Sequence, residues 1–81
     1  MADTEAPIPV SDLTLIATLM TLHHIPLTID RSSPKRVQFM FPSNVQPVID
    51  AYWNRQCLVE PQEFANQIRV TRARIFEGGA V

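Results

Sequence analysis

The chain has 81 residues, with seven Lys and Arg against eight Asp and Glu, and 46% of its residues are hydrophobic. This length predicts one domain, and the hydrophobic fraction is that of a globular protein rather than a disordered one. The formal net charge of −1 gives no bulk attraction to nucleic acid or to a membrane surface. A single cysteine, Cys57, excludes an internal disulfide and fits a reducing compartment, so we expect a cytoplasmic protein.

Neither a targeting segment nor a membrane span is evident. The opening residues "MADTEAPIPV" lack the basic and apolar regions of a signal peptide. The longest apolar run, "LTLIATLMTL", is about half as long as the roughly 20 residues that a spanning helix needs. We therefore expect no membrane partner.

The first part of the chain predicts a tail and then a largely buried helix. Residues 1–10 contain two prolines and two acidic residues, and we expect a flexible tail there. Ser11 then precedes an apolar run that predicts a helix over residues 12–24. Its apolar side chains fill an arc so wide that the helix must be buried on most sides. The remaining face carries Thr14, Thr18 and Thr21.

Two short stretches with a period of two follow. In "LTIDR" (27–31) and "RVQFMF" (36–41), apolar and polar residues alternate on either side of a Ser/Pro turn, which predicts a β-hairpin. A two-stranded hairpin leaves both edges unpaired, so it must pack on helices and can pair with another chain.

Two amphipathic helices complete the pattern. Residues 44–55 predict one, with Ser43 and Gln46 as a capping box. Residues 61–76 predict the other, with Glu60 as its cap.

The resulting fold class is α+β, in the order α-β-β-α-α. One β-hairpin packs on the helices in a single domain over residues 11–77. Gly78 and Gly79 are expected to stop the last helix and begin a short tail over residues 78–81.

Two segments together resemble a family of short bacterial proteins catalogued as a domain of unknown function. They are "SDLTLIATLMTLHHIPL", followed by "VQFMF", and "AYWNRQCLVEPQEFANQIRVTRARIF". The family is similar in its SDLYLAA-like opening helix and its YWN…P-x-x-F-x-N segment, and the likeness covers about residues 11–76. It implies these boundaries but no activity. Relatives tend to have glycine at Arg55, so we expect a different turn there. The matching residues are Ser11, Asp12, Leu13, Tyr52, Trp53, Asn54, Pro61, Phe64 and Asn66.

Patterns typical of catalysis or metal binding are weak. His23 and His24 are adjacent, so they point about 100° apart, unlike the i, i+4 pair of a metal site, and we expect one packed and one partly exposed ring. Cys57 with a histidine leaves a cysteine-based activity as an alternative, although no orienting third group is identifiable. The only two glycines are adjacent, so a phosphate-binding loop is absent. We expect no enzyme activity, no catalytic residue, no metal and no cofactor.

The basic residues are the remaining candidates for binding. All seven lie in residues 31–81, against four acidic residues, a net charge of +3. Six of them form two groups, at the hairpin tip and in the last helix. They do not form one continuous face of that helix, and a solvated structural role competes with binding. The candidate residues for a nucleic acid or a protein partner are Arg31, Lys35, Arg36, Arg69, Arg72 and Arg74.

Two functional hypotheses follow. The first is a small non-enzymatic interaction module, acting as a homodimer or on another protein, because the apolar arc and the hairpin edges exceed what one chain covers. The second is an accessory protein of a mobile element or phage that binds DNA or RNA through the basic hairpin tip and last helix. The aromatic residues favour the first hypothesis, because they follow apolar periodicities and are expected in the core. These are Phe39, Phe41, Tyr52 and Trp53.

Overall fold

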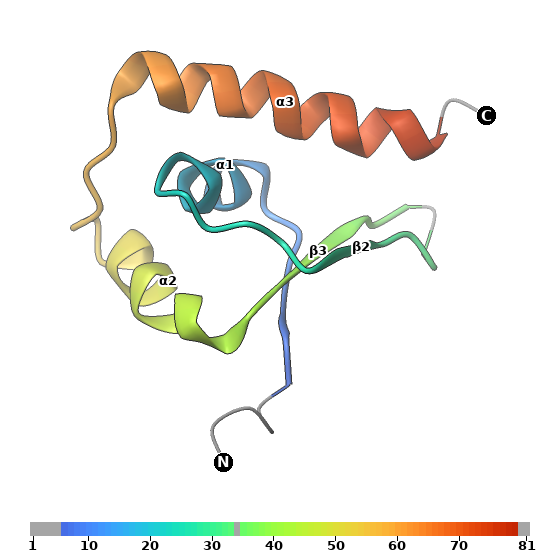
Figure 1. Ribbon diagram of the computed structural model, residues 1–81, viewed down its shortest axis with the longest axis horizontal. Coiled ribbons are helices and arrows are strands. Elements are labelled where there is room, and N and C mark those ends of the chain that lie inside the picture. Colours follow the sequence, from blue (N-terminus) through green and yellow to red (C-terminus); the bar gives the residue numbers. More distant parts are fainter. Residues whose placement is uncertain (1–5, 34, 80–81) are drawn as a thin grey trace.

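The computed structural model describes residues 6–33 and 35–79. It confirms the α+β class, with a three-stranded antiparallel sheet in the order β1-β3-β2 and three α-helices among these residues (Figure 1). A 3₁₀ turn, η2, leads into the second helix. The elements are β1 (Ile8–Val10), α1 (Leu13–Thr21), β2 (Thr28–Asp30), β3 (Gln38–Phe41), η2 (Ser43–Val45), α2 (Gln46–Trp53) and α3 (Pro61–Gly79).

Strand β1 corrects the expected tail over residues 1–10. Its residues pair antiparallel with β3, Ile8 opposite Phe41 and Val10 opposite Phe39. Apolar side chains at Ile8 and Val10 share the inner face of the sheet, and burial of Val10 offsets the cost of ordering this segment. The rest of that predicted tail, residues 1–5, lies outside the described residues. The hairpin thus has one edge of β3 covered by its own chain.

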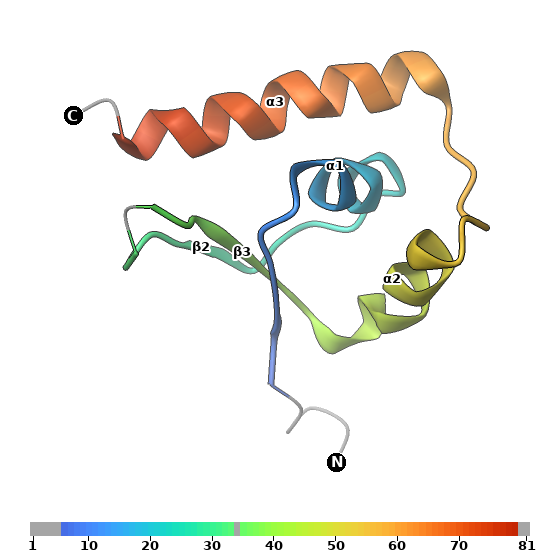
Figure 2. The same cartoon turned by 180° about the vertical axis from the view of Figure 1, so that it is seen from behind.

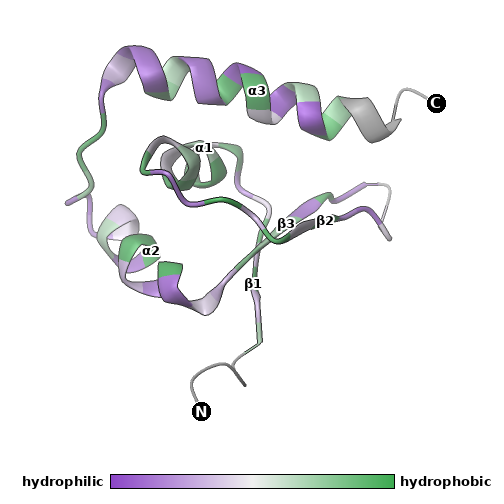
Figure 3. Ribbon diagram, in the orientation of Figure 1, coloured by the Kyte–Doolittle hydropathy of each residue, from purple (hydrophilic) through white to green (hydrophobic). Residues whose placement is uncertain are grey.

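Helix α1 lies at the centre, between α3 on one side and the sheet with α2 on the other (Figures 1 and 2). Its N-cap is Asp12 rather than Ser11, because the Asp12 carboxylate accepts hydrogen bonds from the Thr14 amide (3.1 Å) and hydroxyl (3.0 Å). The apolar arc is covered within the chain, as predicted for a helix buried on most sides. Much of α1 consists of hydrophobic residues, whereas hydrophilic residues predominate in α3 (Figure 3).

The same backbone motif ends α1 and α2. His23 has a φ of 71°, and the amides of His23 and His24 donate to the carbonyls of Met20 (3.0 Å) and Leu19 (2.9 Å). Arg55 has a φ of 60° and ends α2 in the same way. This pattern is the Schellman motif, in which a left-handed residue satisfies the last helical carbonyls. It explains why α1 stops at Thr21 instead of reaching residue 24.

One core joins the sheet to the helices. Most of its members are apolar side chains of α1, β1 and β3, and η2 and α2 close its lower end. The buried set is Val10, Leu15, Ile16, Leu19, Phe39, Phe41, Val45 and Ile49.

The threonine face of α1 is buried at Thr18 and Thr21, whereas Thr14 is exposed and its hydroxyl meets the Tyr52 hydroxyl of α2. The hydroxyls of Thr18 and Thr21 donate to the carbonyls of Thr14 (2.8 Å) and Ala17 (2.7 Å). From α3, the fully buried Thr71 donates to the sulfur of Met20 at 3.7 Å. Internal hydrogen bonds therefore make this face compatible with burial.

Other details of the helix ends differ from expectation. The Ser43–Gln46 capping box does not form, because η2 begins at Ser43 and no side chain caps either η2 or α2. The Glu60 cap is confirmed, since its carboxylate accepts the Glu63 amide at 2.6 Å. Helix α3 continues through Gly79 instead of stopping at residue 76, and residues 80–81 of the predicted tail lie outside the described part.

Trp53 was expected in the core, but 62% of it is exposed. It is the last residue of α2, one turn beyond the buried Ile49. Its ring packs edge-on against that of Tyr52, with ring centroids 5.0 Å apart. Within residues 6–33 and 35–79, no helix combines the length and apolarity that crossing a bilayer requires.

Candidate interaction sites

Arg31 holds the end of β2 against α3. Its Nη2 and Nη1 atoms donate to the carbonyl oxygens of Arg74 (2.6 Å) and Ile75 (3.3 Å). These carbonyls lie toward the C-terminal end of α3, where the helix dipole favours a cation. One of the six predicted binding residues therefore makes an internal contact, which is named the Arg31 clasp below.

The other five predicted cations are exposed, but they do not share one face. Lys35 and Arg36 lie between β2 and β3, at the end of the molecule that also carries the C-terminal half of α3 (Figures 1 and 2). The inward-facing stripe of α3 contains Phe64, Ile68 and Ile75. At about 100° per residue, Arg72 and Arg74 fall on opposite flanks of this stripe, and Arg69 lies further round beyond Arg72. The structure thus brings the hairpin tip to α3 without assembling a continuous basic surface.

A groove separates the turn after α1 from α3. One wall is formed by Met20 and residues 23–26, the other by Gln67 and Arg74, and its volume is about 360 Å³. His23 is exposed and His24 half-buried, so neither is a core histidine. The expectation of one packed ring is corrected, because the left-handed backbone at His23 ends the helix before its apolar face reaches these residues. This region is named the histidine groove.

Gln67 contributes a half-buried side-chain amide to the lining of the histidine groove. Its Nε2 donates to Glu63 Oε2 at 2.8 Å, which orients the amide because a carboxylate only accepts. Its Oε1 is buried and has no hydrogen-bond partner among the described residues. A buried acceptor without a partner is uncommon in folded proteins. Sequence reasoning missed this residue, since only the fold places it opposite the two adjacent histidines.

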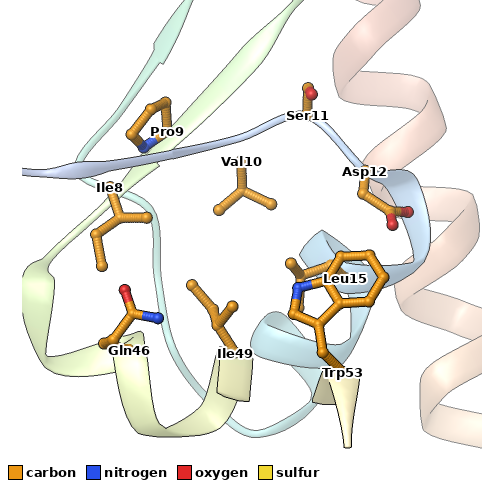
Figure 4. A pocket seen from close by; sticks show the side chains of 9 residues that line it. All are labelled: Ile8, Pro9, Val10, Ser11, Asp12, Leu15, Gln46, Ile49 and Trp53. Carbon is orange, nitrogen blue, oxygen red and sulfur yellow. The ribbon is translucent and has the colours of Figure 1, made fainter. Parts of the chain in front are cut away.

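A second hollow lies on the far side of the molecule, between β1, the start of α1 and α2. Its volume is about 250 Å³. Ile8, Val10 and Ile49 surround it, with Asp12 and the indole of Trp53 at one end (Figure 4). The walls are mainly apolar, and nothing in them carries a charge pattern that selects a ligand.

The two edges of the sheet differ. Pro9 occupies the middle of β1 and has no N–H group, so this edge offers one donor fewer to a further strand. The outer edge of β2 has no proline, and β3 is the strand it pairs with in the described chain. Just before β2, Leu27 is 61% exposed and Ile25 is 76% exposed. Apolar side chains next to an unpaired edge are typical of strand addition.

Cys57 is half-buried in the segment between α2 and α3, and it does not line the histidine groove. Across the described ranges, no group of three or more His, Cys, Asp or Glu side chains is arranged to hold a metal ion.

The chain matches no protein-family model, no curated protein and no solved structure. The family resemblance therefore stays a prediction. Arg55, where the resemblance led us to expect a different turn, adopts the left-handed conformation that glycine takes without strain.

Proposed function

We propose that the protein is a non-enzymatic interaction module that forms a homodimer by pairing the β2 edges of two copies. The observation that supports this is the outer edge of β2, which pairs with no further strand of residues 6–33 and 35–79, beside the exposed Leu27. The wide apolar arc of α1 gives no support, because α3, the sheet and α2 cover it.

An antiparallel pair of β2 strands has the closed two-fold symmetry of most homodimers. With the axis at Ile29, Thr28 of one copy faces Asp30 of the other, so a hydroxyl donor meets a carboxylate acceptor. Leu27 of each copy is then partly removed from water. Pairing extends the sheet to six strands and satisfies backbone groups that are otherwise left to solvent.

The test is the mass in solution at about 10 µM, a concentration at which a Kd near 1 µM leaves mostly dimer. We expect sedimentation equilibrium to give twice the 9.2 kDa of one chain. Leu27→Lys should give the monomer, because lysine at a strand edge opposes pairing. Leu58→Lys is the matched control, because Leu58 is 89% exposed in the segment between α2 and α3. A monomeric wild type, or a dimer that Leu58→Lys disrupts and Leu27→Lys does not, would contradict the proposal.

Nucleic-acid binding has less support as the alternative. Arg31 is held by two carbonyls. Lys35 and Arg36 lie between β2 and β3, and the three candidate arginines of α3 point to different sides of that helix. Fluorescence anisotropy with duplex DNA and single-stranded RNA at about 50 and 200 mM salt distinguishes the two hypotheses. We expect no binding at either salt concentration, whereas steep salt-dependent binding would make the alternative the better explanation.

A further inference from the structure

The histidine groove has the dimensions of a small-ligand site. Its volume of about 360 Å³ is near the lower end of the roughly 300–1,000 Å³ that is usual for ligand pockets. A site of this size accommodates a ligand on the scale of one or two amino-acid residues. The groove is independent of the β2 edge, because Leu27 and β2 are not among the residues that line it.

The charged part of the groove favours an anion. Arg74 lines one wall, and its guanidinium is positive at all physiological pH values and matches a carboxylate in shape. His23 and His24 line the opposite wall. The imidazole of a histidine has an N–H group that can donate a hydrogen bond. The Arg31 clasp uses the backbone carbonyl of Arg74 and leaves its side chain out of that contact.

The other two features are an acceptor and an apolar wall. Gln67 lines the groove, and its Oε1 is shielded from solvent and has no partner in the described chain. A rotation of this side chain toward the groove would let a ligand N–H group complete its hydrogen bonding. Met20, Ile25 and Pro26 form an apolar wall, and Ile25 is 76% exposed. An aliphatic group placed there removes apolar surface from water.

We propose that the histidine groove binds an α-carboxylate that carries a neighbouring N–H group and an aliphatic side chain. Arg74 and the histidines receive the carboxylate, Gln67 accepts the N–H, and Ile25 with Pro26 covers the aliphatic group. Two sources share this chemistry: the C-terminal residue of a peptide and a free aliphatic amino acid.

The first experiment titrates three probes into ¹⁵N-labelled protein and follows amide chemical shifts. N-acetyl-L-leucine represents the peptide end, L-leucine the free amino acid, and N-acetyl-L-leucinamide lacks the carboxylate. We expect saturable shifts around His23, His24, Gln67 and Arg74, with the amide probe weaker by about tenfold because the charged hydrogen bonds are lost. Tighter binding of N-acetyl-L-leucine or of L-leucine identifies the source, and both outcomes support the site. No saturable shift up to about 10 mM of either carboxylate would overturn it.

Matched variants of α3 test the role of Arg74. Arg74→Gln should weaken carboxylate binding by about tenfold. Arg72→Gln removes the same charge from the opposite flank of α3 and should leave the affinity unchanged. An equal loss in both variants would mean non-specific attraction and would overturn the proposal. The titration is repeated on Leu27→Lys, which should bind the carboxylate probes with the affinity of the wild type. Ligand binding in the groove and dimer formation can therefore be contradicted independently of each other.

Discussion

Different interactions stabilise the packing on the two sides of α1. Toward the sheet, α1 meets Phe39 and Phe41, which are fully buried and belong to one continuous apolar core. Toward α3, the fully buried contact is Thr71, whose hydroxyl meets a thioether sulfur, and the apolar residues of that stripe are only half-buried. A sulfur acceptor is weak. The sheet side therefore supplies most of the burial energy, and α3 depends more on attachments at its ends.

Replacing one phenylalanine on each side measures this difference directly. Phe39→Ala should lower the free energy of unfolding by about 3–5 kcal/mol, because it leaves a cavity in a rigid apolar core. Phe64→Ala, on the stripe of α3, should cost about 1–2 kcal/mol, because Phe64 is already partly solvated. Urea unfolding at equilibrium gives both values. Equal losses would show that the α3 side is as tightly packed as the sheet side.

The Arg31 clasp is the next largest contribution to the α3 side. Arg31→Ala should lower the free energy of unfolding by about 1 kcal/mol, since two hydrogen bonds from a charged donor are lost at a partly exposed site. Amide exchange should also accelerate in the C-terminal half of α3 before it does so in β3. Arg36→Ala is the control, because Arg36 is exposed in the same loop. If both variants behave alike, the clasp does not hold α3.

Most elements of the fold follow from sequence periodicity, and the exceptions have physical reasons. The helices and the β2–β3 hairpin were predicted within a few residues, because each carries its own repeat of apolar residues. Strand β1 was missed because three residues around Pro9 show no such repeat, and their pairing with β3 is a tertiary contact. The position of Trp53 was predicted wrongly, because the apolar periodicity of a helix shows which side faces the core but not how far along the helix the core extends.

The candidate sites were less predictable than the fold. The basic residues were recognisable as a set, but the internal use of Arg31 depends on a contact between residues 43 positions apart. The adjacent histidines were visible, whereas their position opposite Gln67 and Arg74 required the packing of α3 on α1. Local patterns therefore identified residue types, and the fold determined which of them meet.

The turn that leads toward α3 has strain that a substitution can remove. Arg55→Gly should raise the free energy of unfolding by about 0.5–1 kcal/mol. The left-handed conformation costs arginine more free energy than it costs glycine, which favours the variant. The greater conformational entropy of glycine in the unfolded chain offsets part of this gain. Asn54→Gly is the control: its φ of −87° gives glycine no advantage, so stability should fall slightly. Thermal unfolding checks both. A stabilising Asn54→Gly, or a destabilising Arg55→Gly, would refute the explanation.

The smallest expected effect concerns the residue before the Arg31 clasp. The pKa of Asp30 lies below its ordinary value of 3.8, because its carboxylate accepts the Ser32 amide and then the Ser32 hydroxyl. A lowered pKa in the folded state means that the charged form stabilises the fold. This contribution is present above about pH 4 and is lost as the pH falls through the folded-state pKa.

Asp30→Asn tests this contribution without removing the acceptor oxygen. The difference in unfolding free energy between wild type and Asp30→Asn should be constant near neutral pH and should shrink as the pH falls below about 4. Urea titrations at several pH values measure it, with Asp50→Asn on α2 as the control for general charge effects. Because Asp30 orders the turn from which Arg31 reaches α3, the same acid range should lower the amide protection factors in the last turns of α3, that is, the protection measured relative to the intrinsic exchange rate at each pH. A difference that grows on acidification would mean that the Asp30 carboxylate opposes the turn, and the clasp would then need another support.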